Sequence, residues 1–510
     1  MKNLFSLRPV LLFSLLLLFS TALAIRAYDI TDLPLDFHPS RQLFSAIKAR
    51  GMFYETLPDA PAARREFAMQ QAKTKVTIEP EIMEHIAVFF YRQTGREQLW
   101  IPRMIAALFW LTGGIFVYLL ARDLTSTDGA MLALAFYLFV PYGIFASRSF
   151  QPDPLMVMLI VAFWWLIFRW ASSSLPFKDG PGVRGSWRYA VLAGLVGGLA
   201  IFVKFVAAFF VIGGALGALL GRFRLRELFR HPQVWTMAVL GMIPGIAWIL
   251  YGKFVLGLFE NGMSGRFIPS LLVSPSFYLQ WQVKAAAVAG GIGIMLGLLG
   301  LLLSQGSVRA FLTGIWGSYV VFGLYFNYHI STHDYYSLPL IPVVALSLAV
   351  LGERFFVNLA EAGQGWVRSA ILLVLLYGIF STVWDVRNQM KSIDYRPQEA
   401  MWIEIGETLQ DHAVIALTQD YGTWLAYWGW QRATIWPSYG DLYQASARGN
   451  PKDIQSLFDE AAASKTYFLV TDMEDLKKQP ELRARLDEFP IAAQGEGYLI
   501  YALQAAPEAE

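Results

Sequence analysis

Residues 153–170 read DPLMVMLIVAFWWLIFRW, in which an aspartate and a proline precede an uninterrupted apolar run that ends at Arg169. A helix rises about 1.5 Å per residue, so such a run nearly crosses the ~30 Å of hydrocarbon in a bilayer. Similar runs recur through residue 386, at 9–25, 104–121, 130–147, 155–170, 189–203, 205–220, 234–254, 285–304, 310–327, 337–352 and 369–386. The sequence therefore predicts a polytopic α-helical membrane protein with about eleven spanning helices.

The composition agrees with a chain that lies mostly in lipid. Hydrophobic residues make up 55% of it and charged residues only 16%, which is far from the balance of a soluble domain. The formal net charge of +2 is too small to indicate a nucleic-acid partner. The chain has no cysteine, which excludes disulfides and thiolate metal sites.

Basic residues predict the orientation of the spans. With the N-terminus inside, the inner loops hold Arg122, Arg169, Lys178, Arg184, Arg188, Arg222, Arg224, Arg226, Arg230, Arg309, Arg354 and Arg368. The short outer loops hold only Arg148, Lys253, Arg266 and Lys284. This bias predicts a multi-pass protein of the bacterial inner (plasma) membrane, with the loop 26–103 and the chain after about residue 387 outside the cytoplasm.

The first apolar run has an alternative interpretation as a cleaved signal peptide. Basic residues precede it, and it ends in the small-residue stretch Ala22-Leu23-Ala24. Cleavage would leave the downstream topology unchanged. We predict a retained first helix.

Two segments outside the spans show patterns of folded structure. Residues 78–91 have apolar positions at helical spacing, which predicts a helix on the membrane surface. After residue 387, short apolar strands at 413–417, 433–436 and 467–470 alternate with helical stretches at 400–410, 452–463 and 480–488. We therefore predict two domains: a transmembrane domain over 1–386, including the loop 26–103, and a small extracytoplasmic α/β domain over 387–510. Residues 172–185 are predicted to be a flexible inner connector.

Charged and polar groups gather at the predicted outer ends of the spans. An ion at membrane depth is costly unless it is paired or functional, so these groups are the candidates for a site. They lie in three clusters, 36–42, 147–154 and 329–336, to which we add Glu79-Pro80 and the isolated Lys204.

Structural roles are open for each of these residues. Asp36 and Asp153 precede helical stretches, so each is also a candidate N-cap residue of a helix. Arg148 is a candidate partner of Asp153 in an ion pair. Lys204 suits snorkelling to the outer interface. His329 and His333 suit an interfacial position, and Glu79, Glu81, Glu84 and His85 have the spacing of a solvated helix face.

The whole arrangement resembles the GT-C-fold glycosyltransferases, in the superfamily of protein O-mannosyltransferases (dolichyl-phosphate-mannose-protein mannosyltransferases, glycosyltransferase family 39) and lipid A aminoarabinose transferases. That superfamily has an acid after the first span, a Glu-Pro in the same loop and an aspartate starting the fourth span. A lysine follows a Gly-Leu-Ala run, and a His-x-Tyr-Tyr-x-Leu-Pro-Leu-x-Pro stretch enters a late helix. The matching positions here are Asp36, Glu79-Pro80, Asp153, Lys204 after Gly198-Leu-Ala, and 333–342.

The sequence departs from the superfamily pattern at two points. Many relatives have an acidic pair after the first span, whereas Asp36 is followed here by Phe37 and His38. The common Glu-Pro-Pro is here Glu79-Pro80-Glu81.

The resemblance implies transfer of a sugar from a polyprenyl-phosphate donor to an acceptor hydroxyl of a lipid, glycan or protein, with inversion at the anomeric carbon. Such chemistry needs a carboxylate base and cations for the leaving phosphate. We predict Asp36 and Asp153 as the catalytic carboxylates. Lys204, Arg148 and Arg41 are predicted to bind the donor phosphate, and the residues predicted to contact substrate or a metal are Glu79, His38, His333, Asp334, Tyr335 and Tyr336.

No certain cofactor follows from the sequence, although a divalent cation (Mg²⁺, Mn²⁺ or Zn²⁺) suits these carboxylates and the histidine. No nucleotide-binding motif is present. Two other classes stay open. A secondary transporter or lipid carrier would use Lys204 and the outer acids to bind its cargo, and a non-catalytic envelope assembly protein would work through its outer domain.

Overall fold

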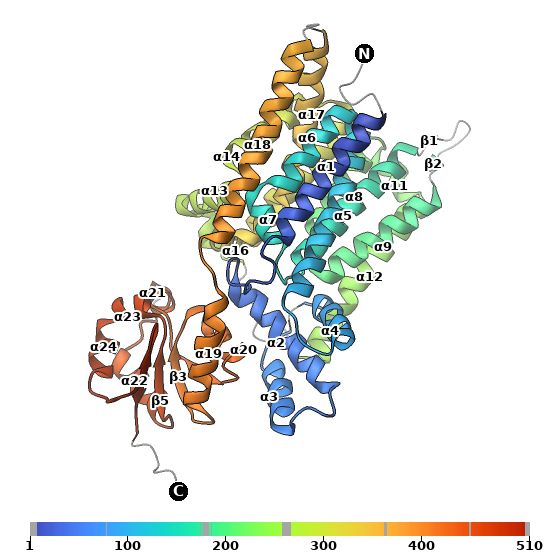
Figure 1. The fold of residues 1–510 in the computed structure, drawn as a ribbon. Coiled ribbons are helices and arrows are strands. Elements are labelled where there is room, and N and C mark those ends of the chain that lie inside the picture. The colour runs from blue at the N-terminus through green and yellow to red at the C-terminus, as the bar shows by residue number, and fades with distance from the viewer. Residues whose placement is uncertain are drawn as a thin grey trace. The chain divides into compact units, whose positions relative to one another are not determined.

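The computed structural model describes residues 8–77, 79–173, 175–176, 183–184, 186–257, 267–361, 365–447 and 450–504. The chain forms two compact units (Figure 1). The first, the helical unit, comprises Met1–Thr31, Val76–Ala87 and Trp100–Ile393. The second, the mixed unit, comprises Asp32–Lys75, Val88–Leu99 and Asp394–Glu510. The predicted domains kept the whole loop 26–103 with the spans, whereas most of this loop is grouped here with the C-terminal residues.

Helices account for almost all of the helical unit. They are α1 (Arg8–Ala27), α5 (Trp100–Leu124), α6 (Thr127–Phe139), α7 (Pro141–Ser147), α8 (Asp153–Ser173), α9 (Trp187–Val203), α10 (Ala207–Leu220), α11 (Leu225–Phe229), α12 (Pro232–Phe254), α13 (Pro275–Ala289), α14 (Gly291–Leu303), α15 (Gly306–Tyr325), α16 (Asn327–Thr332), α17 (Leu340–Glu361) and α18 (Gly365–Lys391), with the short 3₁₀ helices η1 (Pro269–Val273) and η2 (Asp334–Ser337). Helix α4 (Ile82–Thr94) contributes residues to both units.

The helices confirm a polytopic membrane architecture. In the described part of the chain, seven helices are long and apolar enough to cross a membrane, and counting each of two bent pairs as one span makes nine. The bends are 61° between α6 and α7 and 91° between α13 and α14. The first coincides with Pro141, which has no N–H to continue the helix, and the second with Gly290, whose φ is +73°. Helices α9 and α10 are shorter apolar helices, and the total of eleven spans stays a prediction.

Small residues allow close contact between helices in this unit. Helix α10 packs on α15, where Gly213 and Gly217 face Gly314. A Cβ added at Gly314 would lie 2.7 Å from the Cα of Gly217 and closer still to the carbonyl oxygen of Gly213. Glycines at such contacts let backbones approach, and dispersion contacts then hold the helices together without a hydrophobic driving force.

The connector predicted over 172–185 lies largely outside the described residues. Its described part includes a short antiparallel pairing of β1 (Leu175–Pro176) with β2 (Val183–Arg184).

The mixed unit combines two loop helices with an α/β domain. Its helices are α2 (Pro39–Glu55), α3 (Ala62–Lys73), α19 (Arg396–Leu409), α20 (Thr423–Tyr427), α21 (Tyr439–Ala447), α22 (Ile454–Ala462), α23 (Met473–Lys477) and α24 (Pro480–Leu486), with the 3₁₀ turn η3 (Gln419–Gly422). Helix α2 packs on α3 and on α20, which groups the loop with the C-terminal residues. The Gln71 side chain donates to the Ala426 carbonyl oxygen over 2.9 Å.

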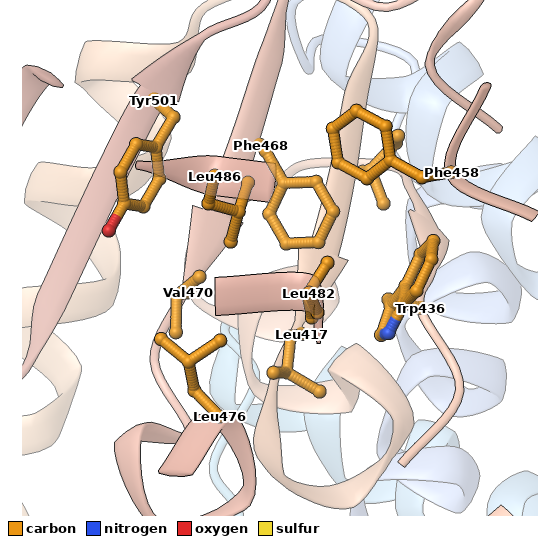
Figure 2. Close-up of a cluster of buried hydrophobic side chains, with 10 residues drawn as sticks. Leu417, Trp436, Phe458, Phe468, Val470, Leu476, Leu482, Leu486 and Tyr501 are labelled. Carbon is orange, nitrogen blue, oxygen red and sulfur yellow. The ribbon is translucent and has the colours of Figure 1, made fainter. Parts of the chain in front are cut away.

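The sheet of the mixed unit has five strands in the order β4-β3-β5-β7-β6. The strands are β3 (Val414–Leu417), β4 (Ala433–Ile435), β5 (Tyr467–Val470), β6 (Ile491–Gly495) and β7 (Tyr498–Ala502). Strand β3 is parallel to β4 and β5, and β7 is antiparallel to β5 and β6. Trp436, Phe458 and Phe468 form an aromatic core beside the sheet, with ring centroids 5.8–6.1 Å apart (Figure 2).

The predicted small α/β domain is confirmed, because β3, β4 and β5 cover the three expected strands and α19, α22 and α24 cover the three expected helices. The hairpin of β6 and β7 was not predicted. Strand β6 reads IAAQG, and only its first residue favours a strand, so its pairing depends on β7.

Candidate functional site

Lys204 lies at a break between two helices. Helix α9 ends at Val203, Lys204 has extended backbone angles (φ −155°, ψ 116°), and α10 begins at Ala207. The break explains why two short apolar runs occur here instead of one long run. It also turns a lysine side chain into the interior, where it is only 5% exposed.

Two carboxylates hold the Lys204 ammonium. Its Nζ donates to Oδ1 of Asp153 over 3.0 Å and to Oδ2 over 3.1 Å. Glu79 Oε1 lies 3.5 Å from the same Nζ. Snorkelling is therefore wrong for Lys204, because its charge is paired inside the protein. One positive and two negative groups give this cluster, which we call the Lys204 cluster, one excess negative charge.

The two acids reach Lys204 from different elements. Asp153 is the first residue of α8, and the positive end of the helix dipole favours a carboxylate at this position. Glu79 precedes α4, and its side chain is 23% exposed. The interpretation of Glu79, Glu81, Glu84 and His85 as one solvated helix face is wrong, because Glu79 lies outside the helix and Glu84 is buried. Ile78, the first residue of the predicted helix, lies outside the described residues.

Aromatic rings face the Lys204 ammonium from η2. The Nζ lies 5.5 Å from the ring centroid of Tyr335 and 5.8 Å from that of Tyr336, within cation–π range. The ring centroids of His333 and Tyr335 lie 5.6 Å apart, and those of His329 and Tyr336 lie 5.2 Å apart. The segment 333–336 was predicted to join Lys204 in one site, and the helical unit brings them together.

Asp334 points to a different partner. Tyr142 of α7 donates its hydroxyl to Oδ1 of Asp334 over 2.9 Å. This bond ties η2 to α7. Sequence patterns did not indicate Tyr142, since a tyrosine after Pro141 has no motif of its own.

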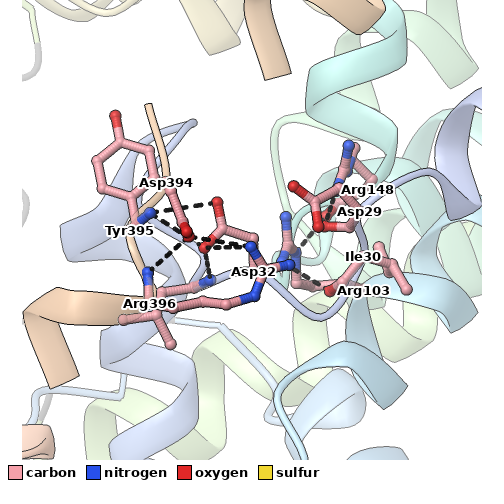
Figure 3. Close-up of polar contacts among 9 residues, drawn as sticks. Asp29, Ile30, Asp32, Arg103, Arg148, Asp394, Tyr395 and Arg396 are labelled. Carbon is pink, nitrogen blue, oxygen red and sulfur yellow. Dashed lines mark hydrogen bonds and ion pairs between the residues drawn. The ribbon is translucent and has the colours of Figure 1, made fainter. Parts of the chain in front are cut away.

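Arg148 lies in a buried network at the end of α7. It is only 2% exposed, and its Nη2 donates to the Asp29 carbonyl oxygen over 3.1 Å. Arg103 in turn donates to the carbonyl oxygens of Arg148 and Ile30, over 3.1 and 3.0 Å (Figure 3). These bonds fix the chain between α7 and α8, just before Asp153. Phosphate binding by Arg148 stays a prediction.

Asp36, His38 and Arg41 belong to the mixed unit. Helix α2 begins at Pro39, so its N-cap residue is His38, whose φ is +44° and whose side chain makes no capping hydrogen bond. Asp36 lies two residues earlier and is not the N-cap residue of α2. Arg41 lies in the first turn of α2.

The backbone around Asp36 is held by a buried side chain of the predicted 36–42 cluster, to which the sequence assigned no role. Gln42 Nε2 donates to the Phe37 carbonyl oxygen over 2.6 Å and to the Pro34 carbonyl oxygen over 3.2 Å. These two acceptors flank Asp36. Tyr395 faces Asp36 and Asp32, and burial together with these two carboxylates raises the pKa of its phenol.

The predicted metal has no ligand set of three in the described part of the chain, where no group of three or more His, Asp or Glu side chains is placed to hold an ion. Asp153 and Glu79 instead share the Lys204 ammonium. A divalent cation stays a prediction.

Comparison with known proteins gives a family profile that matches part of the chain and a fold that the chain shares. The profile of the dolichyl-phosphate-mannose-protein mannosyltransferase family matches residues 79–251, which include Glu79, Asp153 and Lys204. ArnT from Cupriavidus metallidurans has a similar structure, with a TM-score of 0.56, 15% identity and coverage of 97% of this chain and 99% of that one. The chain has the GT-C fold.

Other GT-C structures agree. ArnT from the same organism bound to undecaprenyl phosphate matches with a TM-score of 0.54 and 16% identity, over 96% of this chain and 98% of that one. The Archaeoglobus fulgidus oligosaccharyltransferase matches with a TM-score of 0.53 and 12% identity, over 90% and 69%. No curated protein matches this chain by sequence. The GT-C resemblance drawn from the sequence is thereby confirmed.

Proposed function

We propose that this protein is an inverting glycosyltransferase that moves a sugar from a polyprenyl-phosphate donor to an acceptor hydroxyl at the outer face of the membrane. The observation that carries the proposal is the Lys204 cluster. It is a buried ammonium held by Asp153 and Glu79 beside the rings of Tyr335 and Tyr336. The ammonium and both carboxylates lie within residues 79–251, which match the mannosyltransferase family.

The choice of donor is supported by the fold. The ArnT structure from Cupriavidus holds undecaprenyl phosphate, and AglB from Archaeoglobus fulgidus has been solved with a dolichol-phosphate and an inhibitory peptide. Both ligands are polyprenyl phosphates. The proposed acceptor is a hydroxyl group of a lipid, a glycan or a protein.

The Lys204 cluster suits the polar end of such a donor. A carboxylate accepts hydrogen bonds from sugar hydroxyls, while an ammonium is a point charge suited to phosphate. The rings of Tyr335 and Tyr336 are amphipathic and offer flat apolar faces beside these charges. Asp153 and Glu79 would orient Lys204 before the donor arrives, so that little reorganisation is needed during reaction.

The chemical step exchanges one bond at the anomeric carbon for another. The acceptor oxygen forms a bond to this carbon as the bond to the phosphate oxygen breaks. The electron pair of the broken bond leaves with the polyprenyl phosphate, and the acceptor proton passes to a carboxylate, for which we propose Asp36. General-base catalysis of this kind contributes about 10²–10⁴-fold. Lys204, and on our prediction Arg41, stabilise the charge that develops on the phosphate.

Binding of undecaprenyl phosphate tests the proposal directly. Purified protein in lipid nanodiscs should bind this lipid. The Lys204→Ala variant should bind it more weakly, whereas Lys253→Ala, which removes an exposed lysine of α12, should bind it as the wild type does.

A deletion strain should also lose a sugar from its glycolipids or glycoproteins, and the wild-type chain should restore it. Normal glycosylation in the deletion strain, or equal binding by all three proteins, would contradict the proposal.

A further inference from the structure

We propose that the C-terminal α/β domain positions Asp36 for transfer, and that Asp420 acts as a positioning residue by capping the N-terminus of α2. The role of Asp36 in this inference rests on the proposed function. The cap itself rests on contacts within the mixed unit.

The N-cap residue of helix α2 does not cap the helix with its side chain. The first N–H groups of a helix have no partner within the helix, and Ser, Thr, Asp or Asn usually supplies one from the N-cap position. His38 occupies that position here, and its side chain makes no capping bond. The turn η3 of the C-terminal domain contacts α2, and it carries Asp420. The backbone N–H of Ser40, the second residue of α2, favours the ionised form of the Asp420 carboxylate by hydrogen bonding. An anion at this end also complements the helix dipole.

The turn that carries Asp420 is held in an unusual conformation. Asp420, Tyr421 and Gly422 have φ values of +50°, +55° and +69°, and the first two are not glycines. Non-glycine residues rarely adopt left-handed backbone angles, and they keep them only where their surroundings hold them. The turn η3 contacts α2 on one side and β4 on another, so the strained backbone is kept at the place where the two meet.

Further hydrogen bonds fix the Asp420 carboxylate. Trp424 donates its indole N–H to Oδ2 over 2.9 Å. Next to Asp420, the Gln419 side chain is bonded to the Thr471 carbonyl oxygen over 2.9 Å and to the Thr471 hydroxyl over 2.7 Å. Burial raises the pKa of the Asp420 carboxyl, and the N–H groups of Trp424 and Ser40 favour its ionised form.

A second contact holds the chain on the other side of Asp36. The Asp32 carboxylate accepts the backbone N–H of Leu33 over 2.8 Å and that of Tyr395, at the start of the C-terminal domain, over 3.2 Å (Figure 3). Arg396 lies 4.0 Å from the same carboxylate. Asp36 thus lies between two anchors, at Asp32 and at the α2 N-terminus, and the C-terminal domain contributes to both.

The first test measures the cap without using activity. Amide hydrogen exchange of Asp420→Ala in nanodiscs should be faster than that of the wild type over the first turn of α2, while Asp420→Asn should stay close to the wild type because Asn caps about as well as Asp. The control is Asp453→Ala, which removes the N-cap of α22, where Asp453 accepts the Ser456 N–H over 2.8 Å. Unchanged exchange over 39–42 in Asp420→Ala would overturn the cap.

The second test links the cap to transfer. We expect Asp420→Ala to lower turnover about 10- to 100-fold with little change in the donor KM, because displacing a reacting group by about 1 Å costs up to 10²-fold. Asp420→Asn should restore turnover to within about threefold of the wild type. Asp453→Ala should keep normal turnover. Faster exchange with normal turnover in Asp420→Ala would overturn the positioning role.

A double mutant separates this inference from the proposed function. If Asp420 acts through Asp36, then adding Asp420→Ala to Asp36→Asn should lower turnover no further. Fully multiplicative losses would overturn action through Asp36. An Asp36→Asn variant with normal turnover would contradict the proposed base, and the exchange experiment would still decide the cap.

Discussion

The Nζ of Lys204 lies 3.0 Å from Oδ1 of Asp153, although 51 residues separate the two along the chain. Both side chains are buried, at 5% and 4% exposure. A buried pair of this kind adds little stability by itself, because desolvation offsets the attraction. Breaking it is costly, however, and the chain retains it beside Glu79, Tyr335 and Tyr336. Lys204, Asp153 and Glu79 all lie in the residues that match the mannosyltransferase family profile.

We predict that Lys204→Ala inserts normally into the membrane, uses the donor poorly and unfolds more easily. Removal of one partner leaves buried charge uncompensated, which costs about 3–5 kcal/mol. Adding Asp153→Asn to Lys204→Met should recover much of this stability and none of the transfer. Thermal unfolding and donor kinetics in nanodiscs would check both. Recovery of transfer in the double variant would show that the pair is only structural.

Asp36→Asn is expected to lower turnover by about 10²-fold or more without lowering the melting temperature. The substitution keeps the size of the side chain, and Asn caps helices about as well as Asp, so the fold should tolerate it. Donor binding should change little, because the lost group acts on the acceptor proton. Near-normal turnover would remove Asp36 from the mechanism and make Asp153 the next carboxylate to test.

The topology prediction is that reporters fused after Gly180 and after Gln389 read opposite sides of the membrane. The first should read cytoplasmic and the second periplasmic, because basic residues concentrate in the loops that we place inside. Alkaline phosphatase and a fluorescent protein that matures only in the cytoplasm give complementary signals. The same side for both fusions would mean that the predicted number of spans is wrong.

Substitution of two glycines of α15 should affect the stability of the protein to different extents. Gly314→Val should destabilise the protein by about 1–3 kcal/mol, because the new side chain would meet the backbone of Gly213 and Gly217. Gly317→Val is the matched control, since a Cβ there meets no other heavy atom within 4 Å. Its stability should stay within about 0.5 kcal/mol of the wild type. Melting temperatures in detergent would test the pair, and equal losses would argue against close packing of α10 on α15.

Several site residues were predictable because each carries a local signal. An aspartate that opens an apolar run and a lysine that interrupts one are visible in any reading for membrane spans, and both prove to be partners. Tyr142 and Gln42 carry no such signal. They are an ordinary tyrosine and glutamine whose importance comes from acceptors at Asp334 and at the carbonyls beside Asp36.

The sequence by itself determined the membrane class and the small α/β domain. The length of an apolar run and the spacing of its apolar residues are local properties of the sequence. Because a bilayer offers the backbone no hydrogen-bond partners, a run that crosses it can adopt few structures other than a helix. Only the tertiary structure decided that Lys204 pairs with Asp153 and Glu79, and that the turn carrying Asp420 contacts a helix that begins at Pro39. Both depend on contacts between residues distant in the chain, where a charge is matched by whatever group the packing of helices and sheet brings within hydrogen-bond distance.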